Sequence, residues 1–119
     1  QSTYNAMKTL VKAKDFKYIG EVVFNDTKRE RLDIDSNTLI INNANAIGTI
    51  SAIGKTKVTS IKGAISNYKT NFNDDMQTIS LQFNVNKMSV YLDIKPNGNV
   101  FLTVNQGGTE ITQAGKLSN

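Results

Sequence analysis

The chain has 119 residues, a formal net charge of +4 and a hydrophobic fraction of 39%, so it fits one domain with one core rather than two. It contains no Cys and no His, which excludes disulfides, thiolate metal sites and any triad or base built on those side chains. The positive charge is mild and its lysines are separated, so no nucleic-acid partner is expected.

The first predicted element is an amphipathic helix over residues 2–14. Apolar residues recur at three- and four-residue steps from Tyr4 to Val11, and Ser2 or Thr3 can cap the helix. Lysines gather in its C-terminal half, where the helix dipole favours cations. We expect this helix to pack on the edge of a sheet or to close one end of a barrel.

From residue 16 the period changes to two, which predicts a long strand over residues 16–24. Gly20 has no side chain to pack, and a glycine in mid-strand commonly marks a bulge or bend. The alternation predicts that one face of this strand carries Phe16, Tyr18, Gly20, Val22 and Phe24.

The remaining candidate strands are short runs of β-branched and aromatic residues between turn residues. They cover residues 31–34, 38–42, 46–53, 57–68, 78–86, 88–95, 100–105 and 110–114. The surest hairpin joins Val90–Ile94 to Val100–Val104 through Lys95–Asn99, where Pro, Asn and Gly favour a turn.

No segment between these strands is long enough for a crossover helix, so the sheet should be antiparallel. The sequence therefore predicts an all-β domain, a barrel or sandwich of about eight strands with one N-terminal helix. The single domain would span residues 1–119, with the helix over 1–14 and the β-rich body over 16–117.

Two short patterns resemble functional motifs without completing them. Gly54-Lys55-Thr56 ends like a phosphate-binding loop, but five residues separate Gly54 from Gly48, where the motif requires four. Residues 33–37 open like a calcium loop, but Ala44 stands where that loop needs a bidentate Glu. We therefore predict neither a metal nor a cofactor.

Aromatic residues at alternating strand positions are predicted to lie in the core: Phe16, Tyr18, Phe24, Phe83, Tyr91 and Phe101. Small antiparallel barrels also hold single apolar molecules. In that alternative the strands enclose a ligand cavity lined by Val22, Phe24, Ile50, Phe83, Leu92 and Leu102.

Several segments resemble an uncharacterised family of secreted or envelope domains found mostly in Bacteroidetes, a domain of unknown function. The resemblance runs from Phe16 to the end and rests on Phe16-Lys17-Tyr18, on residues 63–68, on residues 91–100 and on the closing residues 111–117. The chain departs from the family pattern at residues 48–54, which lack its aromatic residues, and at Ala114, where an aromatic commonly precedes the glycine.

The resemblance implies that a signal peptide or lipoprotein signal is removed upstream and that the protein is periplasmic, secreted or on the cell envelope. It implies no activity and no site residues. No apolar run is long enough to span a bilayer, so we expect the chain as given to be soluble.

The favoured function is a non-catalytic binding module, for a small apolar ligand inside the sheet or for an envelope protein. A protein partner would use an exposed apolar patch or pair with an edge strand by β-augmentation. One alternative is a structural envelope component. The other is a carboxylate-dependent hydrolase, with Asp33, Asp35 and Asp93 as its candidate residues. The oligomeric state stays open.

Overall fold

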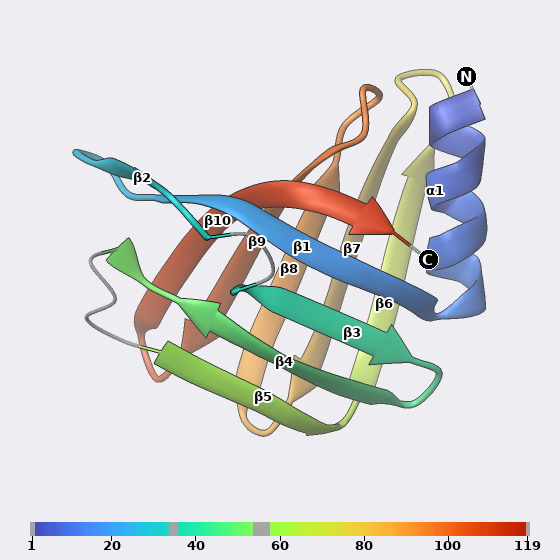
Figure 1. Cartoon of the computed structure of the whole chain (residues 1–119). Coiled ribbons are helices and arrows are strands. Elements are labelled where there is room, and N and C mark those ends of the chain that lie inside the picture. Colours follow the sequence, from blue (N-terminus) through green and yellow to red (C-terminus); the bar gives the residue numbers. More distant parts are fainter. Residues whose placement is uncertain (1, 34–35, 54–57, 119) are drawn as a thin grey trace.

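The computed structural model describes residues 2–33, 36–53 and 58–118. These described residues form one helix and ten strands (Figure 1). In chain order these are α1 (Ser2–Ala13), β1 (Asp15–Phe24), β2 (Arg29–Arg31), β3 (Thr38–Asn42), β4 (Asn45–Ser51), β5 (Val58–Ala64), β6 (Ser66–Asn73), β7 (Thr78–Val85), β8 (Met88–Ile94), β9 (Asn99–Gln106) and β10 (Thr109–Ser118).

The strands form one antiparallel sheet in the order β5-β4-β3-β1-β10-β9-β8-β7-β6, with β2 paired to β1. The sheet curls into a half-barrel, and α1 stands beside β6 at its open side (Figure 1). The predicted fold class, all-β and antiparallel with an N-terminal helix, is therefore confirmed. The structure has ten strands where about eight were expected.

The predicted single strand over residues 57–68 is wrong, because the chain turns a corner at Ile65. Before the corner β5 pairs with β4, and after it β6 pairs with β7. One straight strand could not reach both partners, which lie at opposite ends of the sheet. The Asn86 side-chain amide of the β7–β8 turn donates to the Lys62 carbonyl of β5. This hydrogen bond links the two ends of the sheet. Lys57 lies outside the described residues.

The predicted bulge at Gly20 is confirmed. Beyond it, the side chains of β1 point to the opposite faces of the sheet from those that simple alternation predicts. The pairing of β1 with β10 shifts between Gly20 and Val22. Phe16 and Tyr18 point inward as predicted, but beyond the bulge Val23 is the buried residue, with 1% of its surface exposed. The predicted inward facing of Val22 and Phe24 is therefore wrong, because one extra residue swaps the two faces of a strand.

Two other predicted segments are recovered with small differences. The hairpin of β8 and β9 pairs Ile94 with Val100, and Gly98 in its turn has a φ of 91°. The predicted short strand over residues 31–34 is observed as β2, a few residues earlier. Gly107 and Gly108 link β9 to β10 with positive φ at both positions, the backbone that a two-residue hairpin turn requires.

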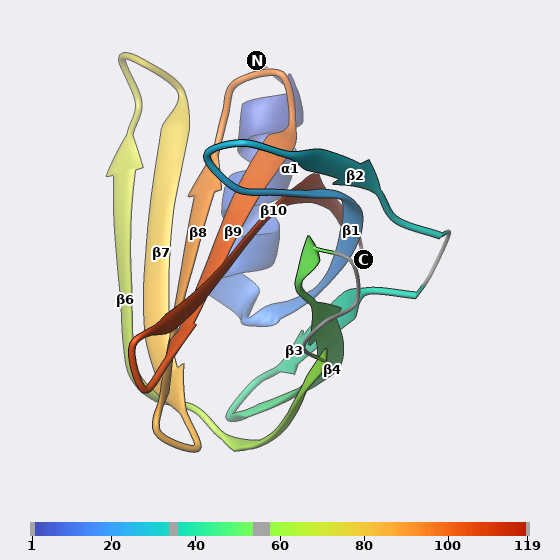
Figure 2. The same cartoon turned by 90° about the vertical axis from the view of Figure 1, so that its left-hand side faces the viewer.

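The core fills the inside of the curl. Its largest fully buried side chains include Phe16, Tyr18 and Phe83, so their predicted core positions are confirmed. The helix closes the open side with Val11, which is fully buried, and with Tyr4. Figure 2 shows α1 between the β6–β8 side and the β1 side of the curl. In the described part of the chain, no helix is long and apolar enough to span a bilayer.

A polar network crosses this core around Gln113, which has no exposed surface. The Gln113 amide donates to Asn37 Oδ1 at 2.9 Å and to the Ser51 carbonyl at 3.0 Å. Its Oε1 accepts the Tyr18 hydroxyl at 3.1 Å, and burial raises the pKa of Tyr18. Among the described residues, no buried side-chain nitrogen or oxygen lacks a hydrogen-bond partner.

A second polar contact docks α1 on the turn after β6. The Tyr4 hydroxyl donates to Asp74 Oδ1 at 2.5 Å, and Lys8 Nζ lies 2.9 Å from the same oxygen. The hydrogen bond to Asp74 raises the pKa of Tyr4 to about 12. The bonds from Tyr4 and Lys8 lower the pKa of Asp74. Further along the helix, the Tyr68 hydroxyl donates to the Val11 carbonyl at 2.8 Å.

Replacing Gln113 with Leu tests the network. The change keeps most of the side-chain volume but leaves the buried Tyr18 hydroxyl and Ser51 carbonyl without these partners. We expect the free energy of unfolding in urea to fall by about 2–4 kcal/mol, because each unpaired buried polar group costs about 1–3 kcal/mol. The matched control is Gln106→Leu at an exposed position, with an effect within about 0.5 kcal/mol. Equal effects at the two positions would contradict the role of the network.

The contact between Tyr4 and Asp74 predicts how stability depends on pH. Because the pKa of Asp74 is lowered in the fold, its carboxylate stabilises the folded state above an unfolded-state pKa of about 3.9. That contribution is lost as the pH falls through the folded-state value. The free energies of unfolding of wild type and Asp74→Asn should therefore differ at neutral pH and converge in acid. Asp75→Asn, which removes the same charge one residue away, should have a smaller effect.

At alkaline pH the folding stability should fall as the pH rises, because the pKa of Tyr4 is raised in the fold. Its hydroxyl contributes fully below an unfolded-state pKa of about 10. The contribution then declines as the pH rises toward about 12. Tyr4→Phe should lack this decline, which urea titrations at a series of pH values would measure. Identical alkaline profiles for wild type and Tyr4→Phe would show that the contact does not hold the helix.

Candidate ligand-binding surface

The six predicted cavity residues do not surround one space. Ile50, Phe83, Leu92 and Leu102 lie inside the curl with at most 1% of their surface exposed. Val22 and Phe24 lie on the outer face beyond the bulge and are half-buried. The four inner residues belong to the continuous core, and the binding role of the set stays a prediction.

Of the carboxylates considered for hydrolysis, the two within the described residues, Asp33 and Asp93, lie on distant parts of the sheet. Asp93 lies on β8 and forms an ion pair with Lys95 at 2.9 Å. Asp33 follows β2, and β1, β10 and β9 separate β2 from β8 in the sheet. Asp35 and the Gly54-Lys55-Thr56 segment lie outside the described residues. Over residues 2–33, 36–53 and 58–118, no group of three or more His, Cys, Asp or Glu could hold a metal ion.

An exposed pair of aromatic rings lies on the outer face of β8 and β9. Tyr91 is 45% exposed and Phe101 is 37% exposed, so their predicted core positions are wrong. Neighbouring residues of a strand point to opposite faces, and Leu92 and Leu102 occupy the inner face. Phe24 packs edge-on against Phe101, with the ring centroids 6.3 Å apart. We call Phe24, Tyr91 and Phe101 the aromatic platform.

The platform borders a hollow of about 580 Å³ on the outer face of β6 to β9, which we call the sheet hollow. Two rows of side chains cross it in register. One row is Lys69, Gln82, Tyr91 and Thr103, and the next is Asn71, Ser80, Asp93 and Phe101. Tyr91 therefore lies between Gln82 and Thr103, and Phe101 lies beside Asp93, on strands about 4.8 Å away across the sheet.

Lys69 and Asp93 are the charged residues that line this hollow, and Asp93 forms an ion pair with Lys95 at its rim. Lys95 Nζ lies 2.9 Å from Asp93 Oδ2 and 5.9 Å from the centre of the Phe101 ring. The ammonium group thus forms an ion pair with the carboxylate and a cation–π contact with the ring face. Both side chains stay about half exposed, so the pair is a polar rim of the hollow and not a buried ion pair.

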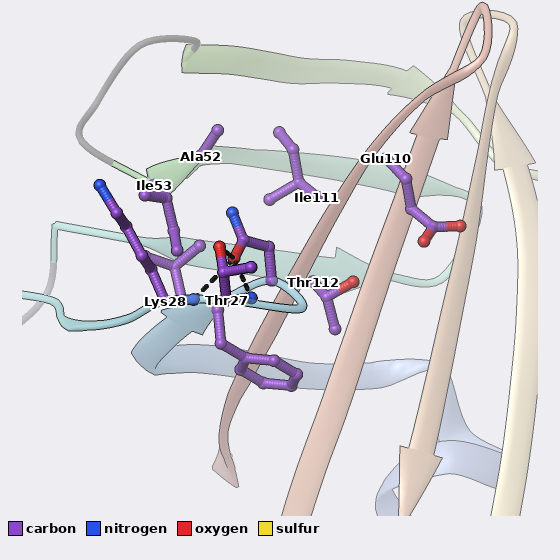
Figure 3. A pocket seen from close by; sticks show the side chains of 10 residues that line it. Thr27, Lys28, Ala52, Ile53, Glu110, Ile111 and Thr112 are labelled. Carbon is purple, nitrogen blue, oxygen red and sulfur yellow. Dashed lines mark hydrogen bonds between the residues drawn. The ribbon is translucent and has the colours of Figure 1, made fainter.

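A second hollow of about 350 Å³, the end hollow, opens at the end of the half-barrel nearest the β1–β2 turn (Figure 3). Ala52 and Ile53, which follow β4, line it together with Ile111 and Thr112 of β10. In the turn, the backbone N–H groups of Thr27 and Lys28 donate to Asn25 Oδ1, each at 2.8 Å (Figure 3).

The two hollows adjoin each other at the aromatic platform. Phe24 lines the end hollow and Phe101 lines the sheet hollow. Because these two rings pack against each other, apolar surface continues from one hollow to the other. The outer face therefore carries a band of aromatic and polar side chains that runs across the strands from β6 to β1.

The sequence contained a signal for this surface. Leu92 and Leu102 were placed inside the sheet, and strand alternation then requires Tyr91 and Phe101 to lie outside. The polar neighbours of the rings had no such signal, because Lys69, Asn71 and Gln82 reach the platform only through the pairing of β6 with β7 and β8.

No protein-family model matches the sequence, and neither does any curated protein. Among solved structures, a DUF4251 family protein from Bacteroides eggerthii is similar, with a TM-score of 0.83 and 17% sequence identity. The match covers 98% of this chain and 87% of that one. The chain therefore has the fold of a DUF4251 family protein, a Bacteroides domain of unknown function, as the resemblance in the sequence predicted.

Proposed function

We propose that the chain is a non-catalytic binding module that holds its ligand on the aromatic platform of the outer face. The observation that carries this proposal is the exposure of Tyr91 and Phe101 together at the border of a hollow. Exposed apolar surface rimmed by polar groups is typical of binding sites. Aromatic residues are also the side chains that most often dominate binding energy.

Packing inside the sheet favours this outer site over an interior ligand. The residues that would have lined an interior cavity, such as Ile50, Phe83 and Leu102, are in contact with the rest of the core. A ligand there would have to displace them, and close-packed cores resist such changes. Both hollows at the platform open to the surface and need no displacement.

The cellular location in this proposal rests on the sequence resemblance and on the shared fold. A binding module in the periplasm or on the cell surface would meet polymers and small molecules of the envelope. Fractionation of the source bacterium with an antibody to the chain would test this location.

The platform rings should contribute to binding and little to stability. We expect Tyr91→Ala to lower the free energy of unfolding by less than about 1 kcal/mol, since half-exposed cross-strand contacts are lost. Phe101→Ala should cost about 1–2 kcal/mol, because it also removes the packing against Phe24. Phe83→Ala on the inner face is the matched control and should cost about 3–5 kcal/mol. Urea denaturation measures all three. If the Tyr91 and Phe101 variants lost as much free energy of unfolding as the Phe83 variant, the two rings would be structural and not binding residues.

Fluorine NMR of the chain labelled with 3-fluorotyrosine tests the binding site directly. The chain has four tyrosines, among them Tyr91 on the platform and Tyr18 in the core, and Tyr→Phe variants assign the signals. The probes are cellohexaose, laurate and an extended decapeptide. We expect at least one probe to shift the Tyr91 signal and leave the Tyr18 signal unchanged.

Two outcomes of this titration would contradict the proposal. A shift of the Tyr18 fluorine signal with the Tyr91 signal unchanged would mean that the ligand binds in the interior of the sheet. Unchanged Tyr91 signals with all three probes would remove the evidence for a binding platform.

A further inference from the structure

We infer that the ligand of the aromatic platform is a neutral, β-linked saccharide chain lying across the strands. This inference rests on the proposed function and names its ligand class. It is carried by the combination of exposed aromatic rings, a rim of amides and hydroxyls, and an ion pair beside Phe101.

Tyr91 and Phe101 fit a ligand that has flat apolar faces. The faces of a pyranose ring carry axial C–H groups that pack against an aromatic ring, while its hydroxyls point outward around the edge. Tyr91 is 45% exposed and offers the larger free ring. Phe101 is partly covered by Phe24 and by the Lys95 ammonium group, so Tyr91 is the main stacking residue.

The rim of the hollow fits the hydroxyl groups of the same ligand. Gln82 and Asn71 each provide a carbonyl acceptor and an NH₂ donor, and Ser80 and Thr103 provide hydroxyls. All four lie in the two rows that contain the rings. A purely apolar ligand would cover these groups without bonding to them, which is unfavourable. A sugar hydroxyl can pair with each one.

The ion pair beside Phe101 favours a neutral chain over an anionic one at that ring, while Lys69 lies two strands from Tyr91 on β6. Asp93 and Lys95 are the charged pair closest to Phe101, and they bond to each other at 2.9 Å. A carboxylate or phosphate on the ligand would have to compete with Asp93 for that lysine. Sugar hydroxyls instead can accept from Lys95 and donate to Asp93 without breaking the pair.

The layout of the platform favours a chain over a single ring. Tyr91, Phe101 and Phe24 come from β8, β9 and β1, and three sheet spacings separate β8 from β1, or about 14 Å at about 4.8 Å each. One pyranose is too short to meet all three rings. An extended β-linked chain can stack on Tyr91, pass Phe101 and Phe24, and place its end in the end hollow.

Isothermal titration with cellohexaose and with glucose tests the inference, together with fluorine NMR on the same samples. We expect cellohexaose to bind with about tenfold or higher affinity than glucose, because one ring contacts only part of the band. Tyr91→Ala should weaken cellohexaose binding roughly tenfold or more, as truncation of a central aromatic residue does. Tyr91→Phe, which keeps the ring, should retain most of the affinity.

The matched control is Ile47→Ala, which removes an exposed apolar side chain from the outer face of β4, far along the sheet from β8. It should leave cellohexaose binding unchanged. An unchanged Tyr18 fluorine signal in every variant confirms that the core is intact.

The outcomes separate the inference from the proposed function. If laurate or the decapeptide shifts the Tyr91 signal and cellohexaose does not, the saccharide inference is overturned and the binding platform stands. If no probe shifts Tyr91, both fail. Equal loss of cellohexaose affinity in Tyr91→Ala and Ile47→Ala would also overturn the inference, because the binding would then not depend on the platform.

Discussion

The fold depends on one buried side chain, the amide of Gln113. Three segments that are distant in the sequence meet at it: β1 through Tyr18, the start of β3 through Asn37 and the end of β4 through Ser51. The amide lies so close to Gly20 that a Cβ there would collide with its oxygen. Because buried polar groups are stable only when they are paired, this network selects one register of β1 against β10. The bulge after Gly20 lies beside this network, and beyond it Phe24 points outward.

The two faces of the sheet therefore differ in their role. The inner face is occupied by the core and by the polar network, and α1 covers its open side with Val11 and Tyr4. The outer face needs few apolar residues for stability, yet it carries Tyr91 and Phe101 beside a polar rim. In the proposed function, the interior of this small β-domain serves folding and its exterior serves recognition. Functional residues would then vary with little effect on the core, which is consistent with a shared fold at 17% identity.

Local patterns in the sequence predicted the local features of the fold. The helix, the β8–β9 hairpin and the bulge at Gly20 all follow from periodicity and turn chemistry, which act between near neighbours. The corner at Ile65 could not be predicted in this way, because the β-type residues continue through it and only the partners of β5 and β6 reveal it. The candidate site likewise has residues that local patterns could predict and residues that they could not. Alternation alone could place Tyr91 outside, whereas its neighbours Lys69 and Gln82 depend on long-range register.

In the proposed function the ligand binds outside, because the core fills the interior of the half-barrel. X-ray diffraction from crystals pressurised with xenon tests this claim most directly, because xenon enters dry apolar cavities without a specific binding group. We expect no xenon atom inside the curl, between Ile50, Phe83 and Leu102. A well-occupied xenon site among these side chains would contradict it, and would show that the sheet encloses room for an apolar ligand.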